Sequence, residues 1–268
     1  MSQLSEIPYF PEVEGFGTTY EAYITSKFLN AFVSERKVAT ACEYPICTFR
    51  VPGAIGAQLA IKGCHVSLAT TDAYTLQKAS VLCRKYELQS RVRLAQIGVD
   101  RLEPESFDLV FHISLLPTMQ RDLGIDPFSC LREMVRLSKR YIIVTNHNLH
   151  YSIPLDRILS WITQTPPQFG EVNLVGPKPL KYMLRKLGLV IQDEFFFDIP
   201  PWMAIDLSKL FPGIRMYSTQ GIAGSDSRTI NNAMRRYSFI EKSPLPRFLK
   251  GLLAHHVATV AEKPRGGS

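Results

Sequence analysis

Apolar residues along the first part of the chain recur at spacings that alternate between helical and extended. Over residues 20–32 they return about every fourth position, which predicts a helix opening at a capping box formed by Thr18 and Glu21. A short apolar run from Cys47 to Val51 then predicts a buried strand. The segment RVPGAIGAQLA, residues 50–60, follows as a glycine-containing loop, with a helix that starts near Gln58.

The same alternation continues as far as residue 146. Asp72 is placed to cap one helix, and Asp126 with Pro127 forms the N-cap and first position of another, which is expected to end at Lys139 and Arg140. Four more strands are expected, at residues 65–70, 91–97, 107–116 and 141–146. Five strands separated by helices predict a doubly wound α/β domain, whose parallel sheet is covered on both faces.

Beyond residue 146 the pattern is less regular. Helices are expected over residues 155–162 and 179–188, followed by strands over 189–199 and 253–263. The long irregular segment between these strands suggests an insertion that covers the sheet like a lid. The resulting division is an N-terminal helical segment at 1–40, a core at 41–198, an insertion at 199–246, and a last core strand with a flexible tail at 247–268.

Composition narrows the class of protein. Hydrophobic residues make up 46% of the 268 residues and charged residues 21%, as in ordinary soluble domains. No apolar run approaches the roughly 18–20 residues of a membrane span, and the first ten residues do not resemble a signal peptide. We therefore expect a cytoplasmic protein. The net charge of +7 is concentrated in the C-terminal half, but no nucleic-acid motif accompanies it, so nucleic acid is not the favoured partner.

Neither the cysteines nor the histidines suggest a metal centre. The five cysteines are scattered without a CxxC pair, which favours packing roles over disulfides or zinc. One pair of histidines follows the fifth predicted strand, and a second pair lies on the last predicted strand, where the two are expected to face opposite ways. A metal site would need a further convergent carboxylate or cysteine. No such residue is identified for the histidines in question, which are His147, His150, His255 and His256.

Several segments, in this order, resemble the class I S-adenosylmethionine (SAM)-dependent methyltransferases that act on small molecules. They are TFRVPGAIG, HVSLATTDAYTLQKA, GVDRLEPESFDLVFHISLL, CLREMVRLSKRYIIVTN and LKYMLRKLGLVIQDEFF. The resemblance covers roughly residues 18–200 and 250–263. It implies a Rossmann-like sheet of seven strands, mostly parallel, with an antiparallel last strand that LAHHVATVAEK would supply.

The resemblance also implies a SAM site at the carboxyl ends of the strands. The family's glycine positions fall on Pro52, Ala54 and Gly56, with Gly53 displaced by one. At Arg50 the family usually carries a carboxylate. A guanidinium there would either repel the cationic cofactor or turn away to pair with an internal acid, and both interpretations stay open. The implied cofactor residues are Arg50, Val51, Pro52, Gly53, Ala54, Gly56, Thr70, Thr71, Asp72, Val99 and Asp100.

Three of the implied residues each have a plainer alternative. Thr70 stands where the family has an acid for the ribose hydroxyls. Asp72 could replace that acid, although capping a helix is sufficient reason for its presence. Asp100 would lie beside the adenine, or it is a solvated loop acid. His112, at the end of the fourth strand, is the candidate general base, with a buried structural histidine as its alternative.

The resemblance implies a SAM-dependent methyltransferase acting on a small, apolar or aromatic molecule. The departures at Arg50, Pro52 and Thr70 support a different hypothesis. In it, the chain has lost SAM binding and serves as a scaffold or regulatory subunit for a protein partner. A third hypothesis assigns the basic C-terminal half to RNA binding. One scaffold hosts many functions, so the fold does not decide among the three.

Overall fold

The computed structural model describes residues 11–46, 51–113, 126–148, 176–199 and 244–264, with the single residues 158, 161, 235, 238 and 241. The described helices and strands are α1 (Pro11–Arg36), β1 (Thr40–Glu43), α2 (Ala54–Ile61), β2 (His65–Thr70), α3 (Ala73–Lys85), β3 (Val92–Gln96), β4 (Phe107–His112), α5 (Pro127–Leu137), β5 (Ser138–His147), α7 (Pro177–Lys186), β6 (Val190–Phe197), α10 (Arg247–Leu253) and β7 (His256–Glu262).

The seven strands form one sheet in the order β3-β2-β1-β4-β5-β7-β6. The pairs among β1 to β5 are parallel, whereas β7 runs antiparallel to both β5 and β6. This topology confirms the expected Rossmann-like α/β fold with an antiparallel last strand. The proposed lid at 199–246 lies almost entirely outside the described residues and stays a prediction.

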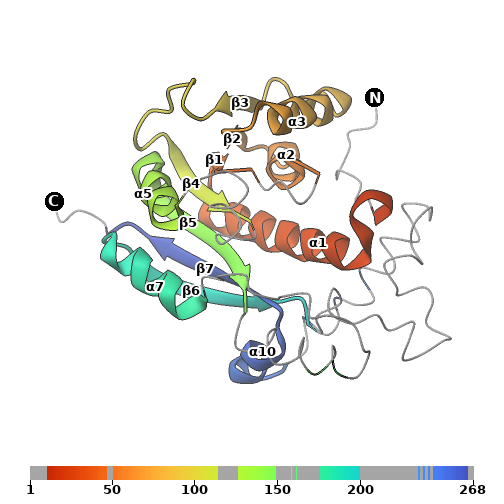
Figure 1. Cartoon of the computed structure of the whole chain (residues 1–268), viewed down its shortest axis with the longest axis vertical. Helices are drawn as coiled ribbons and strands as arrows, with labels where there is room; N and C mark the ends of the chain where they lie inside the picture. Colours follow the sequence, from red (N-terminus) through yellow and green to blue (C-terminus); the bar gives the residue numbers. More distant parts are fainter. Residues whose placement is uncertain are drawn as a thin grey trace.

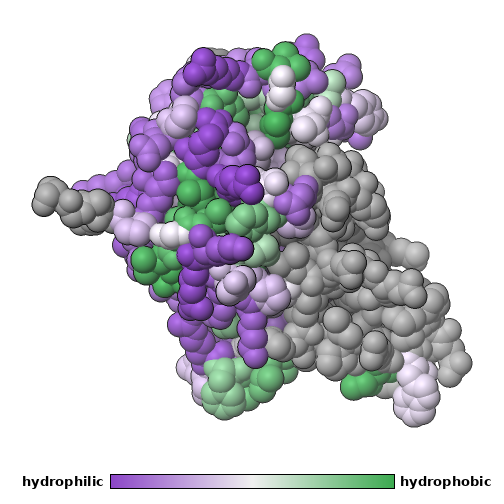
Figure 2. Space-filling model, turned by 60° about the vertical axis from the view of Figure 1, so that its left-hand side comes forward, coloured by the Kyte–Doolittle hydropathy of each residue, from purple (hydrophilic) through white to green (hydrophobic). Residues whose placement is uncertain are grey.

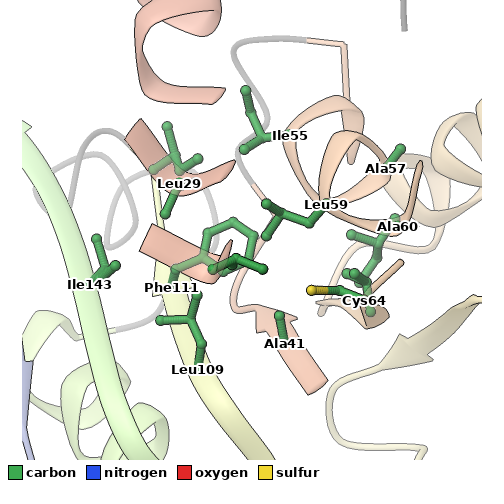
Figure 3. Close-up of a cluster of buried hydrophobic side chains, with 14 of the residues drawn as sticks. Leu29, Ala41, Ile55, Ala57, Leu59, Ala60, Cys64, Leu109, Phe111 and Ile143 are labelled. Carbon is green, nitrogen blue, oxygen red and sulfur yellow. The ribbon is translucent and has the colours of Figure 1, made fainter. Parts of the chain in front are cut away.

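Helices cover both faces of the sheet, as Figure 1 shows. Successive side chains of a strand point to opposite faces, and β4 follows this rule. Leu109 and Phe111 join the core beneath α1, α2 and α3, whereas Val110 joins the core beneath α5 and α7. Figure 3 shows part of the first core, where Leu59 of α2 lies close to Phe111. The central strands contribute mostly apolar side chains to the two cores, which agrees with their nearly continuous apolar sequence.

Two predicted elements are misplaced at the N-terminal end. The first strand of the described sheet is Thr40–Glu43, so the segment from Cys47 to Val51 does not supply it as predicted; residues 47–50 themselves lie outside the described residues. The predicted capping box is also wrong, because α1 begins at Pro11 and both Thr18 and Glu21 lie inside it. Instead of capping a helix, Glu21 is buried against β7, where its Oε1 lies 3.4 Å from Nε2 of His256.

Two further differences concern the later elements. Lys139 and Arg140 do not end α5 but begin β5, where Arg140 forms an ion pair with Glu262 of β7 at 2.6 Å. The segment before β7 contains a short helix, α10, that the sequence did not predict. Its Phe248 and Leu252 are exposed, and Figure 2 shows an apolar patch at the lower end of the molecule, where α10 lies.

The described cysteines behave as packing residues. Cys42, Cys64, Cys83 and Cys130 are buried and unpaired, and burial raises the pKa of each thiol. Cys47 lies outside the described residues. Among the described helices, none is long and apolar enough to cross a lipid bilayer.

Candidate functional site

The carboxyl ends of β1, β2 and β4 meet at one edge of the sheet, at Glu43, Thr70 and His112. In open α/β sheets, ligands bind beyond this edge, where the strand order reverses. Here the order reverses at β1, whose two neighbours are β2 and β4. The candidate site is therefore built around the end of β1.

The acid at the end of β1 is Glu43, which the sequence analysis missed. Its side chain is buried, and its Oε2 accepts a hydrogen bond of 3.0 Å from the backbone N–H of Gly56 in α2. The resemblance put the family's carboxylate position at Arg50. The first strand ends seven residues earlier, and the residue there is an acid. Arg50 itself lies outside the described residues. An acid that directly follows a short strand would have been the signal.

The loop before α2 depends on two glycines. Gly53 has a φ of 75° and serves as the N-cap of α2, a left-handed conformation that residues with a Cβ rarely adopt. A Cβ at Gly53 would lie 2.6 Å from Cδ1 of Leu68 on β2, and one at Gly56 would lie 2.5 Å from Cδ2 of the same side chain. Both glycines thus let α2 pack closely against β2.

The other loop residues complete one tight turn. Pro52 is buried, and Val51 accepts a backbone hydrogen bond of 3.1 Å from Ala54. The turn ends at the first residue of α2, which directs the amino end of that helix towards the carboxyl edge of the sheet. The missing N–H of Pro52 removes one donor from this end.

His112 is buried at the end of β4 and fastens the segment that follows β1. Its Nδ1 lies 3.0 Å from the carbonyl oxygen of Pro45, so that Nδ1 carries the proton and donates it. Backbone hydrogen bonds from Tyr44 to Phe111 and from Ile46 to Ala69 hold the same segment against β4 and β2. His112 therefore has a clear structural task, and its catalytic role stays a prediction.

The residues after β2 are occupied by local hydrogen bonds. Thr70 is fully buried, and its Oγ1 accepts from the N–H of Asp72 at 3.3 Å. Asp72 caps α3, accepting from the N–H groups of Tyr74 and Thr75 at 3.2 and 3.0 Å, one on each carboxylate oxygen. The Thr75 hydroxyl also donates to Asp72. This bond, followed by the two backbone bonds, lowers the pKa of Asp72. Thr71, between them, is partly exposed.

The loop after β3 contains the third implied group. Val99 is 75% exposed, and the carboxylate of Asp100 accepts a 2.6 Å hydrogen bond from the N–H of Gln96. Asp100 lines a pocket of about 220 Å³ with Tyr44 and Ile97. Ligand pockets usually measure about 300–1,000 Å³, so the described residues enclose room for only part of a nucleoside cofactor. A larger pocket of about 280 Å³ lies at the amino ends of the strands, on the opposite edge.

A second group of buried polar residues gathers where β6 ends and β7 begins. The Nδ1 atoms of His255 and His256 lie 3.1 and 3.5 Å from the same Oδ2 of Asp198. The two imidazoles therefore do not face opposite ways, because His255 precedes β7 and is not part of the strand. Asp198 is separated from the histidines by 57 residues, so spacing alone could not have revealed the carboxylate. His147 and His150 lie outside the described side chains.

Glu241 adjoins this group and has an unusual acidity. Its Oε1 accepts from the hydroxyl of Tyr20 at 3.3 Å and from the N–H of Ile199 at 3.0 Å. Burial, together with the nearby charge of Asp198, raises the pKa of Glu241 to about 7. The folded chain therefore favours the protonated acid over a pH range in which the unfolded chain ionises it.

This acidity predicts a specific pH dependence of stability. The pKa of Glu241 rises from 4.5 in the unfolded chain to about 7 in the folded chain, so its contribution to stability is lost as pH rises through that interval. The loss is at most about 3.5 kcal/mol, at about 1.4 kcal/mol for each pKa unit. Glu241→Gln should flatten this fall between about pH 5 and pH 8 in urea unfolding. The exposed Glu35→Gln should retain it, and an unchanged slope in Glu241→Gln would contradict the assignment.

No protein-family model matches the sequence, and no curated protein matches it. Solved structures match it over most of its length. Magnesium protoporphyrin IX methyltransferase from Synechocystis PCC 6803, with bound S-adenosylhomocysteine, aligns at a TM-score of 0.56 and 9% identity, covering 92% of this chain and 85% of that one. Geranyl diphosphate C-methyltransferase from Streptomyces coelicolor A3(2) aligns at 0.51 and 11%, covering 88% and 76%.

One similar structure is described as an enzyme of another kind. The [4+2]-cyclase SpnF aligns at a TM-score of 0.53 and 15% identity, covering 89% of this chain and 81% of that one. Identities this low show the fold alone. The chain therefore has the fold of class I SAM-dependent methyltransferases, and its activity has to be argued from its own residues.

Proposed function

We propose that this chain is a SAM-dependent methyltransferase that acts on a small apolar or aromatic molecule. The observation that carries the proposal is Glu43, an acid at the carboxyl end of β1 that is bound to the amino end of the glycine-containing helix α2. Glu43 is an acid of the kind that the resemblance leads us to expect at the end of the first strand, which supports the proposal against the objection raised by Arg50. The solved neighbours described as methyltransferases add support at the level of the fold.

The residues present fit such a cofactor in outline. Gly53 and Gly56 bring the backbone to the end of β1 without side chains in the way. Thr71 and Asp100 follow β2 and β3 at the same edge, within reach of a nucleoside that lies across it. Bound SAM would supply an electrophilic methyl group. The task of the chain would be to align the acceptor and exclude water.

His112 is the residue proposed to accept a proton from the methyl acceptor. Since its Nδ1 donates to the carbonyl of Pro45, the neutral ring accepts protons at Nε2. A buried imidazole with a fixed tautomer is suited to general base catalysis, which typically contributes about 10²–10⁴-fold to a rate. Alignment of the two reactants would supply the greater part.

Binding of SAM is the direct test. Isothermal titration of the full chain with SAM, and with S-adenosylhomocysteine, should show one site per chain. Glu43→Gln should weaken binding about tenfold or more, because it removes the negative charge at the end of β1 while an amide oxygen can still accept from Gly56. Glu35→Gln, the same change at an exposed position of α1, should bind like the parent.

The alternative function, a methyltransferase-like scaffold without SAM, is favoured by a specific observation. The carboxylates of Asp72 and Asp100 both accept hydrogen bonds from backbone N–H groups nearby in the chain, which gives each a structural reason to be present. The neighbour described as a [4+2]-cyclase shows that this fold is not confined to methyl transfer. Absence of heat at millimolar SAM, from a chain with native circular dichroism, would overturn the first proposal in favour of this alternative.

A further inference from the structure

The polar group at the junction of β6 and β7 is buried to an unusual degree. Asp198 directly follows β6, His255 directly precedes β7, and His256 is the first residue of β7. The antiparallel register pairs Phe197 with His256 and so brings the three side chains together. All three are 0% exposed, and one donor atom of each lies within 4.8 Å of the donor atoms of the other two.

The separations of the two imidazoles from the carboxylate fit coordination of one ion. Zinc is bound by imidazole nitrogen and carboxylate oxygen at about 2.0–2.2 Å, so neighbouring donors of a tetrahedral site stand about 3.3 Å apart. The Nδ1 atoms of His255 and His256 lie 3.1 and 3.5 Å from Oδ2 of Asp198. The other carboxylate oxygen, Oδ1 of Asp198, is buried without a hydrogen-bond partner among the described residues.

The backbone of Asp198 is held in a costly conformation. Its φ of 63° lies in the left-handed region, which is uncommon outside glycine and in which aspartate is one of the tolerated residues. Such outliers persist where the surrounding structure imposes them, and they are frequent at functional sites. Here the conformation accompanies a carboxylate that turns inward between the two imidazoles.

A second carboxylate, that of Glu21, lies beside the ring nitrogen of His256 that would not bind the metal. Metal-ligating histidines usually donate their other ring N–H to a carboxylate, which fixes the tautomer. Oε1 of Glu21 lies 3.4 Å from Nε2 of His256, on the side of the ring away from Asp198. If Nε2 carries the proton, the lone pair of Nδ1 faces the carboxylate of Asp198. A cation between the two relieves the repulsion.

We propose that Asp198, His255 and His256 bind a divalent transition-metal ion of the zinc type, with Glu21 orienting His256 from outside the coordination shell. Two imidazoles and one carboxylate are a ligand set that zinc uses, and three protein ligands leave a further position open. Hard ions such as Mg²⁺ prefer oxygen donors and should bind poorly. The proposal does not depend on methyl transfer, since none of its ligands belongs to the SAM site.

The test uses the full chain, dialysed against a chelator and then titrated with Zn²⁺, Co²⁺ and Mg²⁺. One Zn²⁺ should bind per chain and raise the melting temperature, because the ion binds the folded state preferentially. Co²⁺ should give the strong visible absorption of a four-coordinate site. Asp198→Asn should lower the affinity for Zn²⁺ more than about 100-fold, and Glu21→Gln by about 10- to 100-fold.

His65→Asn is the matched control, since His65 is an exposed histidine at the start of β2. It should bind Zn²⁺ like the parent. Equal weakening in His65→Asn and Asp198→Asn would overturn the proposal, as would the absence of a stoichiometric Zn²⁺ site. If Asp198→Asn does not fold, the Co²⁺ spectrum of the parent decides, because a six-coordinate spectrum contradicts the four-coordinate site of the zinc type that is proposed. SAM titration in chelator separates this result from the proposed function.

Discussion

Gly53→Ala is expected to destabilise the chain by about 2–4 kcal/mol, of which the left-handed conformation costs about 1–2 and overpacking the rest. The substitution meets two obstacles at once. The φ of 75° is unfavourable for alanine, and the new Cβ would lie 2.6 Å from Cδ1 of Leu68 and 3.3 Å from Cβ of Ala79. The second contact is with a side chain that has no freedom to rotate away.

Gly98→Ala separates these two effects. Gly98 has a φ of 88°, but a Cβ there would meet no heavy atom within 4 Å. Gly98→Ala should therefore lose only the free energy that the left-handed conformation costs, about 1–2 kcal/mol of stability. Urea unfolding of both variants measures the difference. Equal losses would mean that Leu68 moves aside at little cost, and that close packing is not the reason for glycine at position 53.

Phe111→Ala is expected to cost about 3–5 kcal/mol, the usual range for removing a buried aromatic side chain. Phe111 lies at the centre of the sheet, is 0% exposed, and packs with Leu59 and Leu109 in the core drawn in Figure 3. Phe248→Ala removes the same side chain from α10, where it is 66% exposed. It should change stability by no more than about 0.5 kcal/mol. Comparable losses in the two variants would contradict the assignment of the core.

Much of this fold could be predicted because its strands are buried on both faces. β2 and β4 coincide with apolar runs, and Asp72 and Asp126 cap α3 and α5 as predicted. β1 was misplaced because its sequence, TACE, is short and weakly apolar, whereas the nearby CTFRV has stronger strand residues. β1 lies at the centre of the sheet because it pairs with β2 and β4. A local sequence pattern cannot show such pairing.

The candidate site was less predictable for the same reason. The glycine loop was recognised, but the register error moved its expected acid from Glu43 to Arg50. The buried group of Asp198, His255 and His256 depends on the pairing of β6 with β7 across a long excursion. Contacts between residues so distant in sequence leave no periodic signal. The burial of Glu21 in the long helix α1 could not be predicted either, since an acid on a helix ordinarily indicates a solvated face.

The position of β7 has a consequence for how the chain is made. β7 is the last of the described strands to be synthesised, yet it lies between β5 and β6, and in the described part of the sheet β6 pairs with no other strand. A nascent chain therefore holds an open strand edge on β5 and an unattached β6 until β7 has been made. A truncation that removes β7 would leave the sheet unfinished and prone to pair with another chain.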